Sequence, residues 1–416
     1  MLMQEFPPPP NDRVTLANWQ DQPFNQWSFS HMRELVPTQI ISRGTTASAP
    51  LPTSLQEVGK VRVHDSSGTE TDVDSVLDST YTDAVVIVHD GKVVLERYLG
   101  ESRPGRPHLL MSMTKSVIGC VAANLIESGA FSPEDFVTAH IPELAGSGYD
   151  GATVRNLLDM RSGVKFSEDY TNPDAEVRVM EEAFGWRPTS DRDVSRSIYD
   201  YLPTLTTDGE HGGPFRYRSC ETLVLGWVCE RAGRKRMAAQ ISELIWVPMG
   251  AGYDADITCD SVGTAIHDGG MSATARDLAR FGLMLLHSGE AEGNRVVPAK
   301  WLRASWAVDP DIRDAFDHSE SGPYLPGGWY RNQFWFLPRE HGDVMLCLGI
   351  NGQMLYINPG TKTVAVKLSS WPDAQAPMLL HDTFRAFDAV GANLSGLTPD
   401  RATHQGPPGI AAGLSR

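Results

Sequence analysis

The segment "HLLMSMTKSVIGCVAANLIESG", residues 108–129, carries a serine and a lysine three positions apart, where an apolar run becomes an amphipathic one. Helical spacing runs from Ser112 to about Glu127, so Lys115 would lie one turn along on the same face as Ser112. The positive end of the helix dipole would favour an alkoxide at Ser112. The structural alternative is a serine that only caps the helix.

The surroundings of Lys115 favour catalysis over capping. Apolar residues lie on both sides of it, and a buried lysine is unfavourable unless its pKa falls or it is paired. A neutral or hydrogen-bonded lysine beside a serine is typical of Ser–Lys hydrolases. A second copy of the motif, Ser162-Gly-Val-Lys165, ends a helix, where the dipole has the opposite sign, and we interpret it as a turn.

Tyr217, in "GGPFRYRSCETLVLG", is the candidate for carrying the proton to the leaving atom. It lies at a predicted loop-to-helix junction, and Ser219 follows two positions later. A nearby lysine charge lowers the pKa of a phenol, which would poise Tyr217 near neutral pH. A similar pattern, Tyr170-Thr-Asn172, competes with it, and a core tyrosine with a satisfied hydroxyl is the structural alternative.

Composition excludes several classes of partner. The net charge of −16 over 416 residues argues against nucleic acid or an anionic membrane surface. The chain has no run of 18 apolar residues and no visible secretory signal, so we expect a cytoplasmic protein without a membrane span. Five scattered cysteines without a CxxC pair favour buried free thiols over disulfides. We expect no metal and no organic cofactor, since HExxH and His-rich ligand sets are missing.

The predicted elements indicate an α/β (α+β) fold. Strand-like runs occur early, as a hairpin about Asp90-Gly91 within 84–99, and late, at 332–338, 344–350, 353–359 and 363–371. One antiparallel sheet from both chain ends would then be flanked by helices, among them 272–289 and 376–394, and would leave a mostly helical inserted domain. The predicted divisions are an N-terminal arm and surface segment at 1–80, an α/β sheet domain at 81–130 and 255–396, a mainly helical domain at 131–254, and a loose tail at 397–416. Short helices are predicted at 150–159, 220–234 and 235–250, and loop at 165–215. A cleft between the two domains is the expected ligand site.

Taken together, the motifs resemble a known family. Ser112-x-x-Lys115, Tyr217-x-Ser219 and "GGMSATARDLARFGLMLLHSG" (269–289) occur in the order found in the serine β-lactamase/penicillin-recognising fold, specifically its class C-like branch with the related esterases. "HLLMSMTKS", "YDGATVRNLLDM", "EDYTNP" and "VKLSSWPD" are similar to the 6-aminohexanoate-dimer (nylon-oligomer) hydrolases, a likeness that runs from about residue 15 to 390.

The resemblance implies a β-lactamase/transpeptidase-like fold and roles for particular residues. Ser112 would be the acylated nucleophile, Lys115 its activator and Tyr217 the proton shuttle. The backbone N–H groups of Ser112 and Ile350 would form the oxyanion hole. Tyr170 would help to hold the amide from a mobile cleft loop, and Glu181 would meet a substrate ammonium. The other expected substrate-binding residues are Trp186, Ser219, His267, Asp268 and Asn351. The resemblance also suggests a homodimer.

Two departures from the family pattern disfavour penicillin recognition. The lysine of the family's Lys-Thr-Gly motif meets a substrate carboxylate, and its position here reads Cys347, in Cys347-Leu348-Gly349. Ser219 stands where lactamases more often have asparagine. We therefore expect a serine hydrolase (amidase or carboxylesterase) that cleaves small linear amides, 6-aminohexanoate-oligomer-like ones included, or short-chain esters through an acyl-enzyme. A β-lactamase or D-Ala-D-Ala peptidase and a non-catalytic binding member of the fold are the alternatives. The sequence leaves open the natural substrate, the stereoselectivity and the exact register around Cys347–Asn351.

Overall fold

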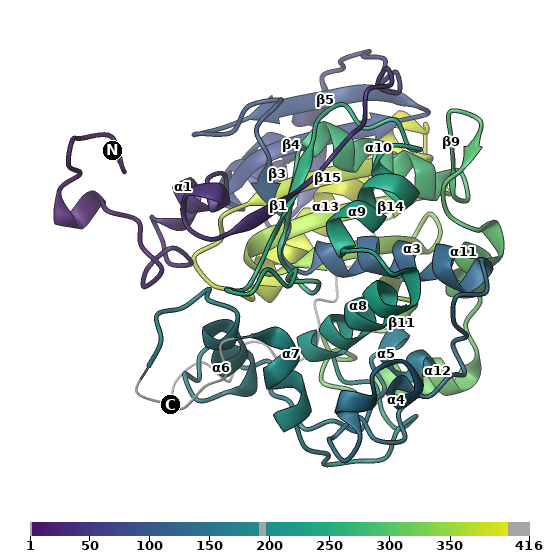
Figure 1. The fold of residues 1–416 in the computed structure, drawn as a ribbon. Helices are drawn as coiled ribbons and strands as arrows, with labels where there is room; N and C mark the ends of the chain where they lie inside the picture. The colour runs from purple at the N-terminus through teal and green to yellow at the C-terminus, as the bar shows by residue number, and fades with distance from the viewer. Residues whose placement is uncertain (1, 191–196, 398–416) are drawn as a thin grey trace.

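A seven-stranded antiparallel sheet forms the centre of the computed structural model, which describes residues 2–190 and 197–397 (Figure 1). The strand order is β11-β12-β13-β14-β15-β4-β5, and the pairing of β15 with β4 joins the two ends of the chain, as the sequence predicts. The strands are Thr82–His89 (β4), Lys92–Tyr98 (β5), Trp329–Arg331 (β11), Phe334–Leu337 (β12), Val344–Gly349 (β13), Gln353–Asn358 (β14) and Thr363–Ser369 (β15).

The predicted hairpin forms between β4 and β5. Its two turn residues, Asp90 and Gly91, have φ angles of 46° and 77°. This pair of left-handed residues matches the twist of the flanking strands, and an Asp-Gly sequence adopts it readily.

Helices cover both faces of the sheet. The alternating side chains of β4 separate the two layers: Val86 and Val88 belong to the core that includes α3 (Met113–Glu127) and α10 (Ala275–Leu286). Val85 and Ile87 point the other way, into the core formed with α2 (Val73–Ser79) and α13 (Pro377–Leu394). Because both faces are covered, the central strands are apolar at nearly every position.

A second, four-stranded sheet, which the sequence did not predict, lies beside the start of α3. Its order is β1-β7-β8-β6, with bounds Thr38–Ile41 (β1), Ala255–Thr258 (β7), Met271–Ala273 (β8) and His108–Leu109 (β6). The predicted helix 272–289 therefore starts late, because Met271–Ala273 pairs as a strand and the Thr274 side chain caps α10 by accepting from the Asp277 N–H. This sheet fixes the chain just before Ser112, where Leu110 N donates to Met271 O at 2.8 Å.

Most of the remaining helices gather below the main sheet in the view of Figure 1. The predicted loop at 165–215 is wrong in part, since it contains α6 and α7. In α6 the buried residues Val177, Met180 and Ala183 recur at helical spacing among acidic ones. The helices not yet given are Val137–His140 (α4), Val154–Leu158 (α5), Glu176–Ala183 (α6), Ile198–Tyr201 (α7), Ser219–Gly233 (α8), Met237–Ile241 (α9), Ala299–Trp306 (α11) and Pro310–Asp317 (α12).

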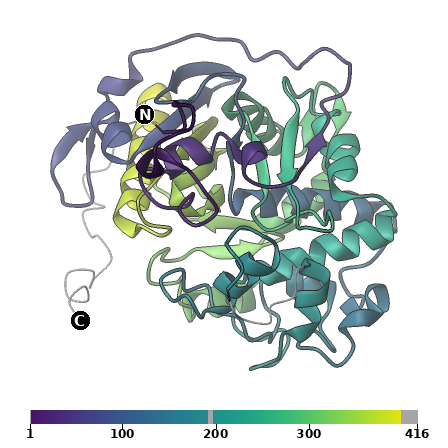
Figure 2. The same cartoon turned by 60° about the vertical axis from the view of Figure 1, so that its left-hand side comes forward.

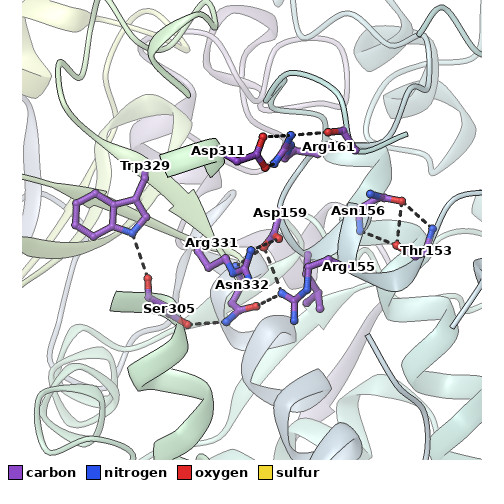
Figure 3. Close-up of polar contacts among 12 residues, drawn as sticks. Thr153, Arg155, Asn156, Asp159, Arg161, Ser305, Asp311, Trp329, Arg331 and Asn332 are labelled. Atoms are coloured by element: carbon purple, nitrogen blue, oxygen red, sulfur yellow. Dashed lines mark hydrogen bonds and ion pairs between the residues drawn. The ribbon is translucent and has the colours of Figure 1, made fainter. Parts of the chain in front are cut away.

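A buried carboxylate joins this helical part to the sheet. Asp159, at the end of α5, accepts a hydrogen bond of 2.8 Å from Arg331 of β11 and lies 3.4 Å from Arg155 of α5 (Figure 3). The same Arg155 donates to the side chain of Asn332 at 2.6 Å. Burial raises the pKa of Asp159, and the two arginines act against that rise. The joint couples the position of α5 to that of the sheet edge.

The N-terminal segment, purple in Figure 2, lies across the molecule. Phe29 O accepts from Leu109 N at 2.7 Å, and Asn25 donates to Trp371 O at 2.9 Å. Trp19 donates to Trp186 O at 2.7 Å. The segment therefore touches the sheet and the helical part at once.

Two predictions from composition can be compared with the described residues. All five cysteines are buried and free, as predicted. Of the helices in residues 2–190 and 197–397, none is long and apolar enough to cross a membrane. The cytoplasmic location stays a prediction. The predicted loose tail lies outside the described residues from position 398 on.

Candidate active site

Ser112 lies directly before α3, at the N-cap position, but its side chain does not cap the helix. Its backbone is already helical, with φ −66° and ψ −7°, and its side chain makes no capping hydrogen bond. The hydroxyl instead accepts a hydrogen bond of 2.9 Å from Lys115 Nζ, one turn further along the helix. The capping alternative for this serine is therefore wrong.

Lys115 is buried, with 1% of its surface exposed, and oxygen atoms surround its amine. Besides Ser112, Nζ donates to Ser219 Oγ at 3.1 Å and to Asp268 O at 2.8 Å. It lies 4.0 Å from the Asp268 carboxylate and 5.1 Å from the centre of the Tyr217 ring. The three hydrogen bonds and the aromatic face compensate for the loss of water around the amine.

The protonation of this cluster differs from the sequence expectation. Burial raises the pKa of Tyr217, and this outweighs the Lys115 charge and the hydrogen bonding to Ser112, which lower it. Burial lowers the pKa of Lys115, but the interactions of its amine with Tyr217, Asp268 and Glu168 raise this pKa by more, so that the net shift is upward. At neutral pH the cluster therefore holds both protons, one on the ammonium and one on the phenol.

Asp268 adds a carboxylate to the cluster. Burial raises its pKa to about 6, although the Lys115 charge opposes the rise. One of its oxygens, Oδ1, is buried and has no hydrogen-bond partner among the described residues. A buried, unpaired acceptor is unfavourable in a folded protein, and it is the kind of group that a ligand satisfies.

Glu168 is a member of the site that the sequence reasoning missed. One of its oxygens accepts from the backbone N–H of Ser219, and the other accepts from the Tyr170 hydroxyl at 2.6 Å. The residue lies two positions before Tyr170 in the quoted "EDYTNP". It links the Tyr170 loop to the segment that carries Tyr217.

The cluster opens on a cavity of about 20 Å³, room for about one water molecule. Apolar side chains form one wall, and the polar members surround Ser112. The lining residues are Met111, Ser112, Tyr170, Val177, Met180, Glu181, Phe184, Trp186, Ser219, Asp268, Gly269 and Ile350.

Of the expected substrate-binding residues, Tyr170, Glu181, Trp186, Ser219 and Asp268 line this cavity. Glu181 lines it as a buried residue paired with Arg178 at 2.7 Å and with Arg187 at 3.5 Å, which the sequence did not predict.

His267 and Asn351 are not among the lining residues. The His267 ring is fully buried, and its Nδ1 lies 3.3 Å from Leu223 O. The Asn351 amide donates to Trp371 O at 2.9 Å, and the residue has a left-handed backbone with φ 57°. In this structure both side chains hold neighbouring backbone instead of facing the cavity.

The end of β13 lies directly against the chain before Ser112. A Cβ added to Gly349 would lie 2.5 Å from Leu110 O, so only glycine allows this approach. Ile350 follows at the start of a short 3₁₀ turn, Ile350–Gly352, and lines the same cavity as Ser112. Within residues 2–190 and 197–397, the N–H groups of Ser112 and Ile350 donate to no carbonyl outside the regular helices and strands. Their placement fits the oxyanion hole that the resemblance implies.

Cys347 offers no cation to the cavity. It lies in β13 opposite Leu355, is buried, and has a pKa raised to about 12 by burial. Its thiol is therefore neutral, in contrast to the lysine at this position of the Lys-Thr-Gly motif. Among the described residues, no group of three or more His, Cys, Asp or Glu side chains is placed to hold a metal ion.

Comparison with known proteins gives concordant matches. Residues 75–389 match the profile of the family described as Beta-lactamase. The 6-aminohexanoate-dimer hydrolase of Paenarthrobacter ureafaciens is 38% identical over 384 residues, which is 90% of this chain and 95% of that protein. A solved structure from Bacillus anthracis, which carries the same enzyme name in provisional form, superposes with a TM-score of 0.86 at 28% identity, over 94% of this chain and 100% of that one. A family VIII carboxylesterase shares the fold, with a TM-score of 0.55 at 16% identity over 76% of this chain and 96% of that one.

Proposed function

This chain belongs to the Beta-lactamase family, and on that basis we propose that it is a serine hydrolase that cleaves small linear amides and short-chain carboxylic esters through an acyl-enzyme. The observation that carries the proposal is the 2.9 Å hydrogen bond between Lys115 Nζ and Ser112 Oγ at the wall of the cavity. The 38% identity to a 6-aminohexanoate-dimer hydrolase supports linear amides of that kind as one substrate class.

The reaction starts from the form of the Lys115/Tyr217 pair that has lost one proton. That pair takes the proton of the Ser112 hydroxyl while Oγ forms a bond to the substrate carbonyl carbon. The carbonyl oxygen becomes an oxyanion, which the N–H groups of Ser112 and Ile350 stabilise. Because these donors are backbone groups fixed by α3 and β13, they need no reorganisation as the charge develops.

Collapse of this intermediate breaks the bond to the leaving group. Tyr217 gives the proton taken from Ser112 to the departing nitrogen or oxygen, which leaves Ser112 acylated. Water then repeats the sequence: the pair takes a proton from water, hydroxide oxygen adds to the acyl carbon, and Ser112 Oγ departs with the returned proton. Amine departure demands that proton more than alkoxide departure does, so esters should react faster than matched amides.

The alternative of a β-lactamase or D-Ala-D-Ala peptidase is less well supported. Penicillins carry a carboxylate, and the Cys347 thiol at the family's lysine position is buried and neutral. The alternative of a non-catalytic binding protein gives no reason for a buried lysine bound to the hydroxyl of Ser112. A homodimer stays a prediction, which light scattering on the purified protein tests.

Mass spectrometry of the intact protein tests the proposal. The protein is incubated with p-nitrophenyl esters, linear amides including a 6-aminohexanoate dimer, and penicillins, and is quenched in acid. We expect a mass increase equal to the acyl group, on the peptide that contains Ser112, and no increase for Ser112→Ala. An adduct on another residue, or full hydrolytic activity of Ser112→Ala, contradicts the assignment. A stable penicilloyl adduct without an ester or amide adduct selects the alternative.

A further inference from the structure

We propose that Arg178 acts as a built-in counter-ion of Glu181. The cavity is thereby selective for substrates in which the terminal group that contacts α6 is uncharged. This inference deepens the proposed function and rests on it. It assigns to Arg178 a role in specificity, and among the proposed amides and esters it ranks those with an apolar, neutral end above those that carry an ammonium group. It departs from the expectation that Glu181 receives a substrate ammonium.

The contacts of Arg178 use all three nitrogens of its guanidinium group. Nη1 donates to Glu181 Oε2 at 2.7 Å, one turn further along α6. Nε and Nη2 both donate to the backbone oxygen of Tyr170, at 3.0 and 2.7 Å, and the group lies 5.2 Å from the centre of the Tyr170 ring. Only 13% of the side chain is exposed. A guanidinium held this way is a fixed charge behind Glu181 and not a mobile surface charge.

Both oxygens of Glu181 already have partners within the protein. Arg187 lies 3.5 Å from Oε2, the oxygen that also binds Arg178. Gln20 of the N-terminal segment donates to Oε1 at 3.1 Å and accepts from Arg178 at 2.8 Å. The carboxylate is 3% exposed and faces two cations. A substrate ammonium at Glu181 would lie beside the Arg178 guanidinium, so that two like charges would share one buried carboxylate.

Among the described residues, the rest of the cavity lining also lacks an unpaired negative charge. Its other carboxylate, Asp268, lies 4.0 Å from the Lys115 ammonium. The side chains that share the wall with Glu181 are apolar: Met111, Val177, Met180, Phe184 and Trp186. Each carboxylate of the lining thus has a cation beside it, and the remaining surface there favours hydrocarbon.

Matched substrate pairs test the proposal. One pair is p-nitrophenyl hexanoate and p-nitrophenyl 6-aminohexanoate, which differ by a terminal methyl or ammonium on the acyl side. A second pair carries the same two ends on the leaving side of a linear amide. For the wild-type protein we expect kcat/KM to favour the neutral member on at least one side by about tenfold or more, as a buried like charge predicts.

Variants at the pair assign this preference to Arg178. Arg178→Met removes the charge at similar length, and we expect it to shift the ratio toward the ammonium substrate by about tenfold or more. Arg178→Lys keeps a cation and should keep the wild-type direction. Adding Glu181→Gln to Arg178→Met should cancel the shift, because no carboxylate is then exposed to the ammonium.

Three results overturn or redirect the inference. Wild-type preference for the ammonium member on both sides contradicts it, and this measurement needs no variant to fold. A folded Arg178→Met protein with an unchanged ratio also contradicts it. If the wild-type protein forms no acyl adduct and hydrolyses none of the four substrates, the proposed function fails, and the assignment of Arg178 to specificity fails with it.

Discussion

The hydroxyl of Ser162 donates a hydrogen bond of 2.7 Å to the carboxylate of Glu221, and both side chains are buried. Arg218 completes the group by donating to Ser162 O at 2.8 Å and to Glu221 at 3.1 Å. Burial raises the pKa of Glu221 to about 7, and Arg218 and Ser162 oppose the rise. The second Ser-x-x-Lys motif therefore supports the segment beside Tyr217 and lies apart from the Ser112 cluster.

Replacement of Ser162 should affect stability more than catalysis. Ser162→Ala leaves the buried Glu221 carboxylate one donor short, which should lower the free energy of unfolding by about 1–3 kcal/mol. Urea denaturation measures the loss. Ester kcat/KM per folded molecule should stay within about tenfold of wild type, whereas Ser112→Ala should fold normally and be inactive. An inactive but fully stable Ser162→Ala protein would contradict this division of roles.

Removal of the Tyr217 hydroxyl should lower the turnover of amides more than that of activated esters. Tyr217→Phe deletes the group placed to protonate the leaving nitrogen, so we expect amide turnover to fall by about 10²- to 10⁴-fold. p-Nitrophenyl esters should lose less, because nitrophenolate departs without a proton. Steady-state kinetics on one ester and one amide with the same acyl group measures the difference. An unchanged amide rate would mean that another residue carries the proton.

Proline at position 350 removes one proposed oxyanion donor. Gly349 has φ −133° and ψ 148°, a conformation suited to the residue before proline, and Ile350 is the first residue of a 3₁₀ turn, where proline fits well. Ile350→Pro should therefore lower kcat by about 10²- to 10³-fold. Ile350→Ala keeps the N–H and is the matched control. Equal activity of the two variants would exclude this N–H from the reaction.

Activity should rise with pH above neutrality. The pKa values of Lys115 and Tyr217 are both raised, so at pH 7 the pair holds one proton more than the reactive form. Each unit of pH below the governing pKa then lowers the reactive fraction about tenfold, and kcat/KM should climb between pH 7 and 9. The measurement is a pH profile with p-nitrophenyl acetate, in which circular dichroism checks the fold. A maximum near pH 5 would be incompatible with this protonation state.

Glu168→Gln should move the pH profile of kcat/KM to lower pH. The charge of Glu168 raises the pKa of Lys115, of Tyr217 and of Asp268, so its removal lowers all three and makes the reactive form available earlier. Glu127→Gln, at the exposed end of α3, is the control for a general change in charge. If both variants shift the profile equally, the local effect of Glu168 is refuted.

Local sequence patterns predicted the helices and strands that are long enough to show a clear periodicity. The β4–β5 hairpin, the four late strands and helices α3 and α13 all follow from alternation, helical periodicity or an Asp-Gly turn. The sheet β1-β7-β8-β6 was missed because its strands have only two to four residues each. Helix α6 was missed because charged residues separate its three buried apolar positions inside a stretch rich in turn formers.

The contacts of the site were likewise predictable only where their residues are close in the sequence. Ser112 and Lys115 are one helical turn apart, so their contact could be predicted from spacing. The pairing of Glu168 with Ser219, or of Gln20 with Glu181, joins residues far apart in the chain, and no local pattern contains it. The sequence also predicted the wrong direction for the Tyr217 pKa, because the burial that outweighs the lysine charge depends on the whole fold.

The N-terminal segment supports the cavity wall from outside the region that the family profile matches. The Beta-lactamase family profile begins at residue 75, whereas Trp19 and Gln20 already bind Trp186 and Glu181 in the cavity wall. Chimaeras that exchange the N-terminal segment between relatives would therefore alter which substrates are accepted while the chemistry is inherited unchanged, and a directed-evolution library confined to the shared family core would leave that wall unsampled.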